Sequence, residues 1–141
     1  MSKLNFPVEE FTTPNPITAT EETQLEDLNL LMKENSIRHL PIIRGTEVVG
    51  VVSDRDLRMA SGLTRGEKKQ VRACDIMATD PVTVSAGATL DEVALEMSKK
   101  KIGSVVVNDE NDKFYGIFTV TDALNALIEI ARASEKNERM D

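Results

Sequence analysis

The chain has 141 residues, a formal net charge of −7 and one cysteine, Cys74. This length suits one ordinary domain with a buried core, and one cysteine excludes an internal disulfide framework or a cysteine-rich zinc site. The negative charge argues against a nucleic-acid or anionic-membrane surface, and no stretch approaches the roughly 18 apolar residues of a membrane span. We therefore expect a soluble, cytoplasmic protein with no nucleic-acid or membrane partner.

The first predicted elements are a strand and a helix. A short strand is predicted at 16–20, PITAT, because a proline suits the first position of a strand. TQLE at 23–26 has the threonine-to-glutamate spacing of a capping box, which predicts a helix start. Leu25, Leu28 and Met32 then recur at helical spacing. They define one apolar face of the predicted helix.

A hairpin and a short helix are predicted next. The β-branched runs LPII at 40–43 and VVGVVS at 48–53 flank a short polar loop, which predicts a β-hairpin. After Asp56 the sequence offers barely two helical turns before Gly62. Residues 61–72 are rich in charge and are predicted to form a linker.

The same order of elements is predicted again in the second half. PVTVS at 81–85 predicts a strand, and TLDE at 89–92 predicts a second capped helix. SVVV at 104–107 and YGIFT at 115–119 predict a second hairpin. Both halves therefore predict a strand, a helix, a hairpin and a closing helix.

The second closing helix carries an apolar stripe. Leu124, Leu127, Ile128 and Ala131 recur at i, i+3, i+4 and i+7, which predicts a packed helix. The stripe is more apolar than the outer helix of a monomer should be, so we expect a homodimer that buries it. The alternative is that the stripe packs within one chain. Residues 132–141 are polar and are expected to fray.

The two halves are an internal repeat. Pro16 aligns with Pro81 at an offset of 65, and Asp56 aligns with Asp122 at an offset of 66, because one residue is added in a polar turn. Neither half is long enough for a complete core, so we expect the halves to pair about a pseudo-twofold axis. The predicted organisation of the single module 1–141 is a first unit at 8–60, a linker at 61–72, a second unit at 73–131 and a polar tail at 132–141.

The duplicated unit resembles a known family. IRHLPII is followed by GVVSDRD in the first half, and GIFTVTD matches the latter string in the second half. These strings are similar to those of a tandem pair of cystathionine β-synthase-type (CBS) domains, a Bateman module. The resemblance covers about residues 8–131. It implies an α+β fold of two tandem β-α-β-β-α units.

The resemblance also implies ligand-binding positions. In nucleotide-binding members, the last aspartate of the second string accepts hydrogen bonds from ribose hydroxyls, and a hydroxyl residue three positions earlier lies near ribose or phosphate. Asp56 with Ser53, and Asp122 with Thr119, hold these positions. A carboxylate can accept from two adjacent hydroxyls, so the implied chemistry is reasonable. Positions that face adenine or ribose are held by Thr20 and Ser85.

The resemblance further implies that the two sites differ. In some members a basic pair before the second strand contacts phosphates, and Arg38 and His39 hold these positions, with Arg55 as a third basic residue. Protonation of His39 near pH 6 would strengthen phosphate binding further. The corresponding positions of the second repeat hold Gly103, Ser104 and Thr121.

Several of these residues could have a structural role instead of the ligand-binding role that the resemblance implies. Asp56 and Asp122 both lie at predicted helix starts, where an aspartate is a favoured cap. Arg38 and His39 could form a solvated loop pair at a helix end, where cations are favourable. Cys74 could be a small buried apolar residue or a reactive thiol, and the sequence around it favours the former.

An enzyme is not expected. One histidine and one cysteine give no catalytic set or metal site, and no GxSxG, HExxH or P-loop string occurs. The expected function is a stand-alone regulatory sensor that binds adenine nucleotides (AMP, ADP, ATP or S-adenosylmethionine) in clefts between its units. It would signal to a separate, unknown effector protein. The alternative is a scaffold or interaction module that has the same fold and needs no ligand.

Overall fold

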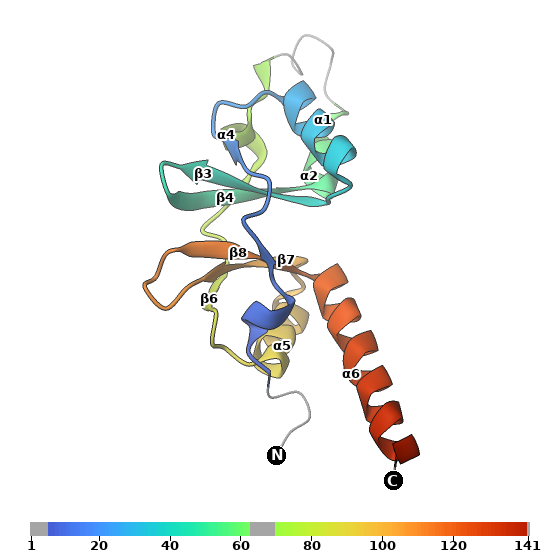
Figure 1. Ribbon diagram of the computed structural model, residues 1–141. Coiled ribbons are helices and arrows are strands. Elements are labelled where there is room, and N and C mark those ends of the chain that lie inside the picture. The colour runs from blue at the N-terminus through green and yellow to red at the C-terminus, as the bar shows by residue number, and fades with distance from the viewer. Residues whose placement is uncertain (1–5, 63–69, 141) are drawn as a thin grey trace. The chain divides into compact units, whose positions relative to one another are not determined.

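The computed structural model describes residues 6–62 and 70–140 (Figure 1). They form two compact units, each with its own four-stranded sheet. One unit, Asn15–Pro81, is continuous in sequence and is called the first-repeat unit. The other joins the residues before Asn15 to those from Val82 onward and is called the second-repeat unit. Residues 63–69 of the predicted linker lie outside the described residues.

The first-repeat unit has helices on one face of its sheet, which has the strand order β2-β3-β4-β5 (Figure 1). Strands β2 and β3 are parallel because a helix joins them, whereas β3, β4 and β5 are antiparallel neighbours. Its elements are β2 (Ala19–Thr20), α1 (Leu25–Asn35), β3 (His39–Arg44), β4 (Glu47–Ser53), α2 (Asp54–Ala60), α4 (Ala73–Ile76) and β5 (Ala78–Thr79).

The second-repeat unit has the equivalent strand order, β6-β7-β8-β1, again with one parallel pair and two antiparallel pairs. The predicted order of strand, helix, hairpin and helix is therefore confirmed in both units, and the fold is mixed α+β. The elements of this unit are the 3-10 helix η1 (Val8–Phe11), β1 (Thr13–Pro14), β6 (Thr83–Ser85), α5 (Leu90–Lys100), β7 (Ser104–Asn108), β8 (Phe114–Thr119) and α6 (Val120–Met140).

Each unit is completed by a segment that precedes the other repeat in the sequence. Residues 6–14 precede the first repeat, but they pair with β8 in the second-repeat unit. Residues 71–79 precede the second repeat, but they pair with β4 in the first-repeat unit. We call these stretches the leading segments. The compact units therefore begin and end at different positions from the predicted repeats, 8–60 and 73–131.

The leading segments make equivalent contacts in the two units. Val8 and Ala73 stand 65 residues apart and are both fully buried. The Val8 amide donates to the Ala88 carbonyl (2.8 Å). The Ala73 amide donates to the Thr23 carbonyl (2.8 Å). Both segments thus contribute an apolar side chain to the core and backbone hydrogen bonds to the turn before a helix.

The capping boxes predicted at the starts of α1 and α5 are wrong, because neither helix has a side-chain hydrogen bond at its N-cap. The leading segments take their place. The Leu25 amide, the first of α1, donates to the Val71 carbonyl (3.0 Å). The Leu90 amide, the first of α5, donates to the Phe6 carbonyl (2.7 Å). In each helix, a distant backbone carbonyl therefore satisfies one of the first amides, which have no partner within the helix.

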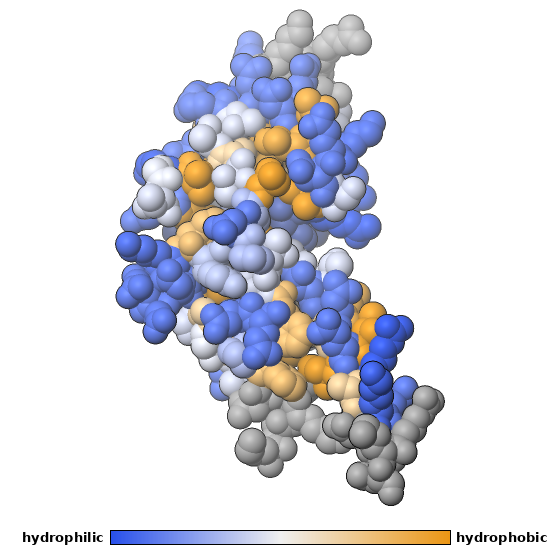
Figure 2. All heavy atoms as spheres, viewed as in Figure 1, coloured by the Kyte–Doolittle hydropathy of each residue, from blue (hydrophilic) through white to orange (hydrophobic). Residues whose placement is uncertain are grey.

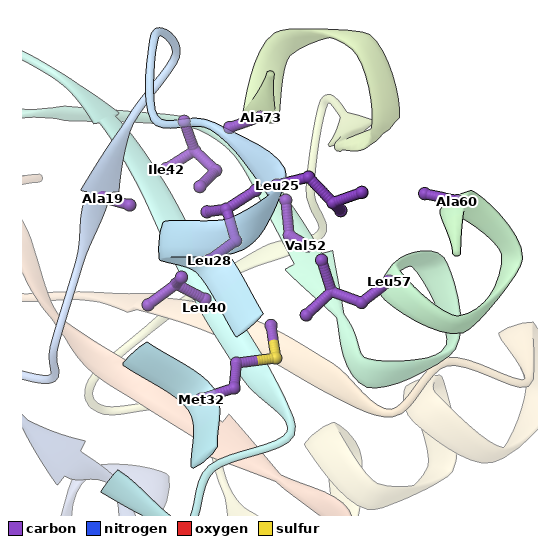
Figure 3. Packing of buried hydrophobic residues seen from close by; sticks show 10 residues of the cluster. All are labelled: Ala19, Leu25, Leu28, Met32, Leu40, Ile42, Val52, Leu57, Ala60 and Ala73. Atoms are coloured by element: carbon purple, nitrogen blue, oxygen red, sulfur yellow. The ribbon is translucent and has the colours of Figure 1, made fainter. Parts of the chain in front are cut away.

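The core of the first-repeat unit lies between α1 and the hairpin (Figure 3). Leu28 of α1 and Leu40 of β3 are fully buried, and Met32 lies one turn further along the same helix face. Full burial of one such side chain stabilises the folded state by about 1.5–3 kcal/mol. The apolar face predicted for this helix is therefore confirmed.

The apolar stripe on α6 is exposed in the single chain, so the alternative in which it packs within one chain is wrong. Ala126 is fully buried, and Ala123 and Ile130 pack against the core beside it. Leu124 and Leu127 are 55% and 59% exposed on the other side of the helix. Small alanines allow the helix to approach the sheet closely, and the large residues of the stripe lie on the side of α6 that faces away from this core. Apolar side chains of this region are visible at the surface in Figure 2.

The end of α6 also differs from the prediction. The helix continues through Met140, whereas residues 132–141 were expected to fray. Among the described residues, no helix is long and apolar enough to cross a membrane.

Candidate ligand-binding site

The carboxylate of Asp56 forms a reciprocal pair with Ser53 where β4 ends and α2 begins. The Ser53 amide donates to Asp56 Oδ2 (2.8 Å), and the Asp56 amide donates to Ser53 Oγ (3.1 Å). This is a capping box with Ser53 as the N-cap residue and Asp56 as its partner, so Asp56 has a structural role at the start of α2. The box uses Oδ2, which leaves Oδ1 of the same carboxylate outside it. A capping role and a ligand role can therefore coexist.

Asp122 and Thr119 repeat this arrangement where β8 meets α6. The Thr119 amide and hydroxyl both donate to Asp122 Oδ2, at 2.9 and 3.0 Å. The Asp122 amide is 3.3 Å from Thr119 Oγ1 and donates to it. Both residues are half-buried, like their counterparts in the first-repeat unit. The duplication has thus kept the side-chain types and also their geometry.

The strand register brings His39 to the Ser53–Asp56 pair. His39 is the first residue of β3 and lies directly across from Ser53 on β4. The preceding Arg38 is exposed, and its carbonyl accepts a hydrogen bond from the Asp54 amide (2.8 Å). Arg38, His39, Ser53 and Asp56 therefore gather at one edge of the first-repeat unit, which we call the basic edge.

Burial sets the protonation state of His39. Desolvation lowers the pKa of its imidazole, Asp56 raises it, Arg38 lowers it and Asp54 raises it, with a net lowering from the usual value near 6.5. His39 is thus neutral at neutral pH in the free protein. Asp54 was not predicted as part of this edge, although it stands beside Ser53 in SDRD. It also forms an ion pair with Arg58 (3.7 Å).

The equivalent edge of the second-repeat unit carries no basic side chain at these positions. Ser104 lies across from Thr119, and the Gly103 carbonyl accepts from the Val120 amide (3.1 Å). Thr121 is exposed and occupies the position of Arg55, which is also exposed. We call this the neutral edge. The backbone geometry of the two edges matches, while their charge does not.

Thr20 and Ser85 do not join these edges within their own units. Thr20 lies beside Ile43 in the parallel β2–β3 pair, at the opposite end of β3 from His39. Ile43 stands four positions after His39 along β3, a distance of about 13 Å. Ser85 lies beside Asn108 in the same way. The Thr20 amide instead donates to Thr23 Oγ1 (3.1 Å), so Thr20 has a local structural role.

Cys74 is half-buried rather than buried, and its Sγ lies 4.0 Å from Asp75 Oδ1. Within the described residues, no group of three or more His, Cys, Asp or Glu side chains is placed to hold a metal ion.

Two copies of one β-α-β-β-α unit, each with a hydroxyl–aspartate pair at the same edge, define a duplicated α+β fold. The family model described as "CBS domain" matches residues 8–62 and 73–129. The chain therefore belongs to the CBS domain family.

Known proteins share this architecture. The chain is 33% identical over 122 residues to inosine-5'-monophosphate dehydrogenase of Korarchaeum cryptofilum, covering 86% of this chain but 24% of that enzyme. The chain thus spans about a quarter of that relative's length. CBSX2 of Arabidopsis thaliana, solved in complex with AMP, has a TM-score of 0.77 at 28% identity, covering 89% of this chain and 98% of CBSX2.

A further structural match is the CBS domain pair of protein MJ0100, solved in complex with 5-methylthioadenosine and S-adenosyl-L-methionine. Its TM-score is 0.76 at 27% identity, and the match covers 86% of this chain and 94% of that one. The ligands of these two solved relatives all contain adenosine.

Proposed function

We propose that this chain is a regulatory sensor module that binds adenine nucleotides at the basic and neutral edges and transmits their presence to a separate effector protein. The observation that carries the proposal is the duplicated hydroxyl–aspartate pair. In both units, one carboxylate oxygen caps a helix and the other lies outside the cap. A carboxylate oxygen in this position can accept from a ribose hydroxyl.

The solved relatives support the ligand class. The CBSX2 complex contains AMP, and the MJ0100 complex contains 5-methylthioadenosine and S-adenosyl-L-methionine. These ligands share an adenosine group and differ in charge. AMP, ADP, ATP and S-adenosylmethionine are therefore the candidates for this chain. No catalytic role is proposed, because the chain matches the dehydrogenase over only 24% of that enzyme.

The unequal charge of the two edges supports unequal preferences. Arg38, Arg55 and a protonated His39 would offer charge-assisted hydrogen bonds to phosphate oxygens, which are roughly twice as strong as neutral ones. The basic edge should thus prefer more phosphorylated ligands and bind them less tightly in high salt. Ser104 and Thr121 on the neutral edge suit a less charged nucleoside group.

A ligand panel tests the proposal. We expect at least one of AMP, ADP, ATP and S-adenosylmethionine to raise the Tm, because a ligand at a hundredfold excess over its Kd stabilises the native state by about 2.7 kcal/mol. For a chain of this size, that is roughly 8 °C in differential scanning fluorimetry. Calorimetry then gives the Kd and stoichiometry. If no ligand changes the Tm or produces heat, the ligand-independent scaffold replaces the sensor.

We also propose that the module is a homodimer through α6. A groove of about 370 Å³ lies between α5 and α6, and its apolar lining includes Met97, Ile102, Leu124 and Leu127. Helix α6 contributes both a groove wall and an exposed apolar side, where Ile128 is 46% exposed. A twofold contact could therefore seat α6 of each copy in the groove of the other.

Charged substitutions test the dimer. Leu124→Asp with Leu127→Asp should weaken association at least about a hundredfold, because each copy would place two charges in an apolar contact. Light scattering should give twice 15.6 kDa for the parent and 15.6 kDa for the double variant. Met59→Asp is the control, since Met59 is 71% exposed on α2 and lies outside the groove. A parent mass of 15.6 kDa would refute the dimer.

A further inference from the structure

The basic edge contains the only histidine of the chain in a setting that holds it neutral. His39 is half-buried at the first position of β3, and Ser53 faces it from β4. The charged groups around it are Asp54 and Asp56 from α2 and Arg38 from its own segment. Two carboxylates and one guanidinium therefore surround an imidazole that can gain a proton.

With these neighbours, the charge of a bound ligand can change the protonation state of His39. Asp56 holds a fixed position, because its Oδ2 accepts from the Ser53 amide at 2.8 Å. Asp54 is engaged with Arg58 at 3.7 Å. Their negative charges raise the pKa of the imidazole and so offset part of the lowering that burial causes. An added phosphate nearby would bring further negative charge and favour the imidazolium.

We propose that His39 couples ligand binding at the basic edge to the uptake of a proton, so that phosphorylated ligands bind more tightly as the pH falls. The inference rests on the proposed nucleotide-binding function. The proton comes from solvent and adds to the neutral imidazole when the phosphate binds. Occupancy of the basic edge would thus depend on both the nucleotide concentration and the pH. The neutral edge has Ser104 at the equivalent strand position and should bind without this coupling.

The direction of the pH dependence of ligand affinity follows from the linkage between ligand binding and proton binding. Burial lowers the pKa of His39 in the free protein, and a bound phosphate raises it. The complex then binds more protons than the free protein between these two pKa values. Affinity should therefore rise as the pH falls through this window, by up to about tenfold per pH unit. Above the pKa of the complex and below that of the free protein, His39 contributes no pH dependence.

Proton NMR measures the coupling directly, because a single histidine gives one resolved imidazole titration. We expect the His39 pKa to rise by at least about one unit when the protein is saturated with ATP, and to change little with adenosine. In the free protein, Asp56→Asn should lower the His39 pKa, since the Asp56 charge raises it. An unchanged pKa in that variant would contradict the predicted proximity.

Calorimetry provides the second measurement. Titration with ATP at pH 6, 7 and 8, in buffers of different ionisation enthalpy, should show proton uptake by the parent protein. His39→Gln keeps a side chain of similar size that does not titrate, so comparison with it removes the titration of ATP itself. If ATP binds but leaves the His39 pKa of the parent unchanged, and the parent takes up no more protons than the variant, the coupling is refuted and the nucleotide site stands. If no nucleotide binds, both are refuted.

Discussion

Replacing Asp56 and Asp122 with asparagine is expected to abolish the nucleotide-induced rise in Tm and leave the unliganded protein about as stable as the parent. An asparagine oxygen can still accept the amide hydrogen bonds that Ser53 and Thr119 make to these side chains, at 2.8 and 2.9 Å. Its NH₂ group, however, is a donor where two ribose hydroxyls need an acceptor. The substitution therefore separates capping from ligand binding.

Alanine at the same positions should give a different result. It also removes the acceptor of the Ser53 and Thr119 amides, so the unliganded protein should lose about 0.5–1.5 kcal/mol per site. Asp75→Asn is the matched control, because Asp75 Oδ2 accepts from the Arg72 amide (2.9 Å) in the same kind of box but lies outside both edges. Thermal shift and calorimetry with the ligand that binds the parent measure the effect. If the double asparagine variant binds the ligand as tightly as the parent, the two aspartates have only a structural role at the helix starts.

The largest loss of stability is expected from Gly116→Ala. Gly116 on β8 lies beside Pro14 of the leading segment, and a Cβ built there would be 2.1 Å from the Thr13 carbonyl oxygen. A backbone oxygen cannot rotate away as a side chain can. The β1 strand must therefore move off the sheet. We expect a loss of about 3 kcal/mol or more, at the upper end for overpacked cores.

Two other glycines calibrate this result. A Cβ at Gly50 would meet Met77 Sδ at 2.5 Å, which is the movable part of a flexible side chain, so Gly50→Ala should cost less. Gly87 has no atom within 4 Å of a built Cβ, so Gly87→Ala should change stability by about 0.5 kcal/mol or less. Urea unfolding followed by circular dichroism gives the three values. An equal loss of stability in Gly116→Ala and Gly87→Ala would contradict the close approach of the Thr13 carbonyl oxygen to Gly116.

The hairpins, the first helix of each repeat and the repeat itself could be predicted because their signals are local. The β-branched runs and the helical spacing of Leu25, Leu28 and Met32 correctly predicted the hairpins and the buried helix face, whereas the short strands β1 and β5 were not predicted. The positions of the helix starts were predicted to within one residue, but the hydrogen bonds at these starts were not. Their amides are satisfied by Val71 and Phe6, which are distant in sequence and contribute only backbone carbonyls, so no residue type signals the contact.

The candidate site was predicted in part. The family resemblance paired Ser53 with Asp56, and the structure has this pair as a capping box, whose two residues stand three positions apart. His39 joined them through strand register, which follows from the hairpin. Thr20 was grouped with them by resemblance, but its own strand holds it about 13 Å from that end of β3. The side of α6 that packs on the core is formed largely by alanines. A pattern based on large apolar residues does not detect that side.

The leading segments also affect the order in which the protein can fold during synthesis. Residues 15–81 form a continuous unit, so all of its contacts are available once that stretch has left the ribosome. Residues 6–14 emerge earlier, yet Thr13 pairs with Ile117, more than one hundred residues later. Contacts of such long sequence separation form slowly. The N-terminal segment should therefore stay exposed to chaperones and proteases until β8 is made.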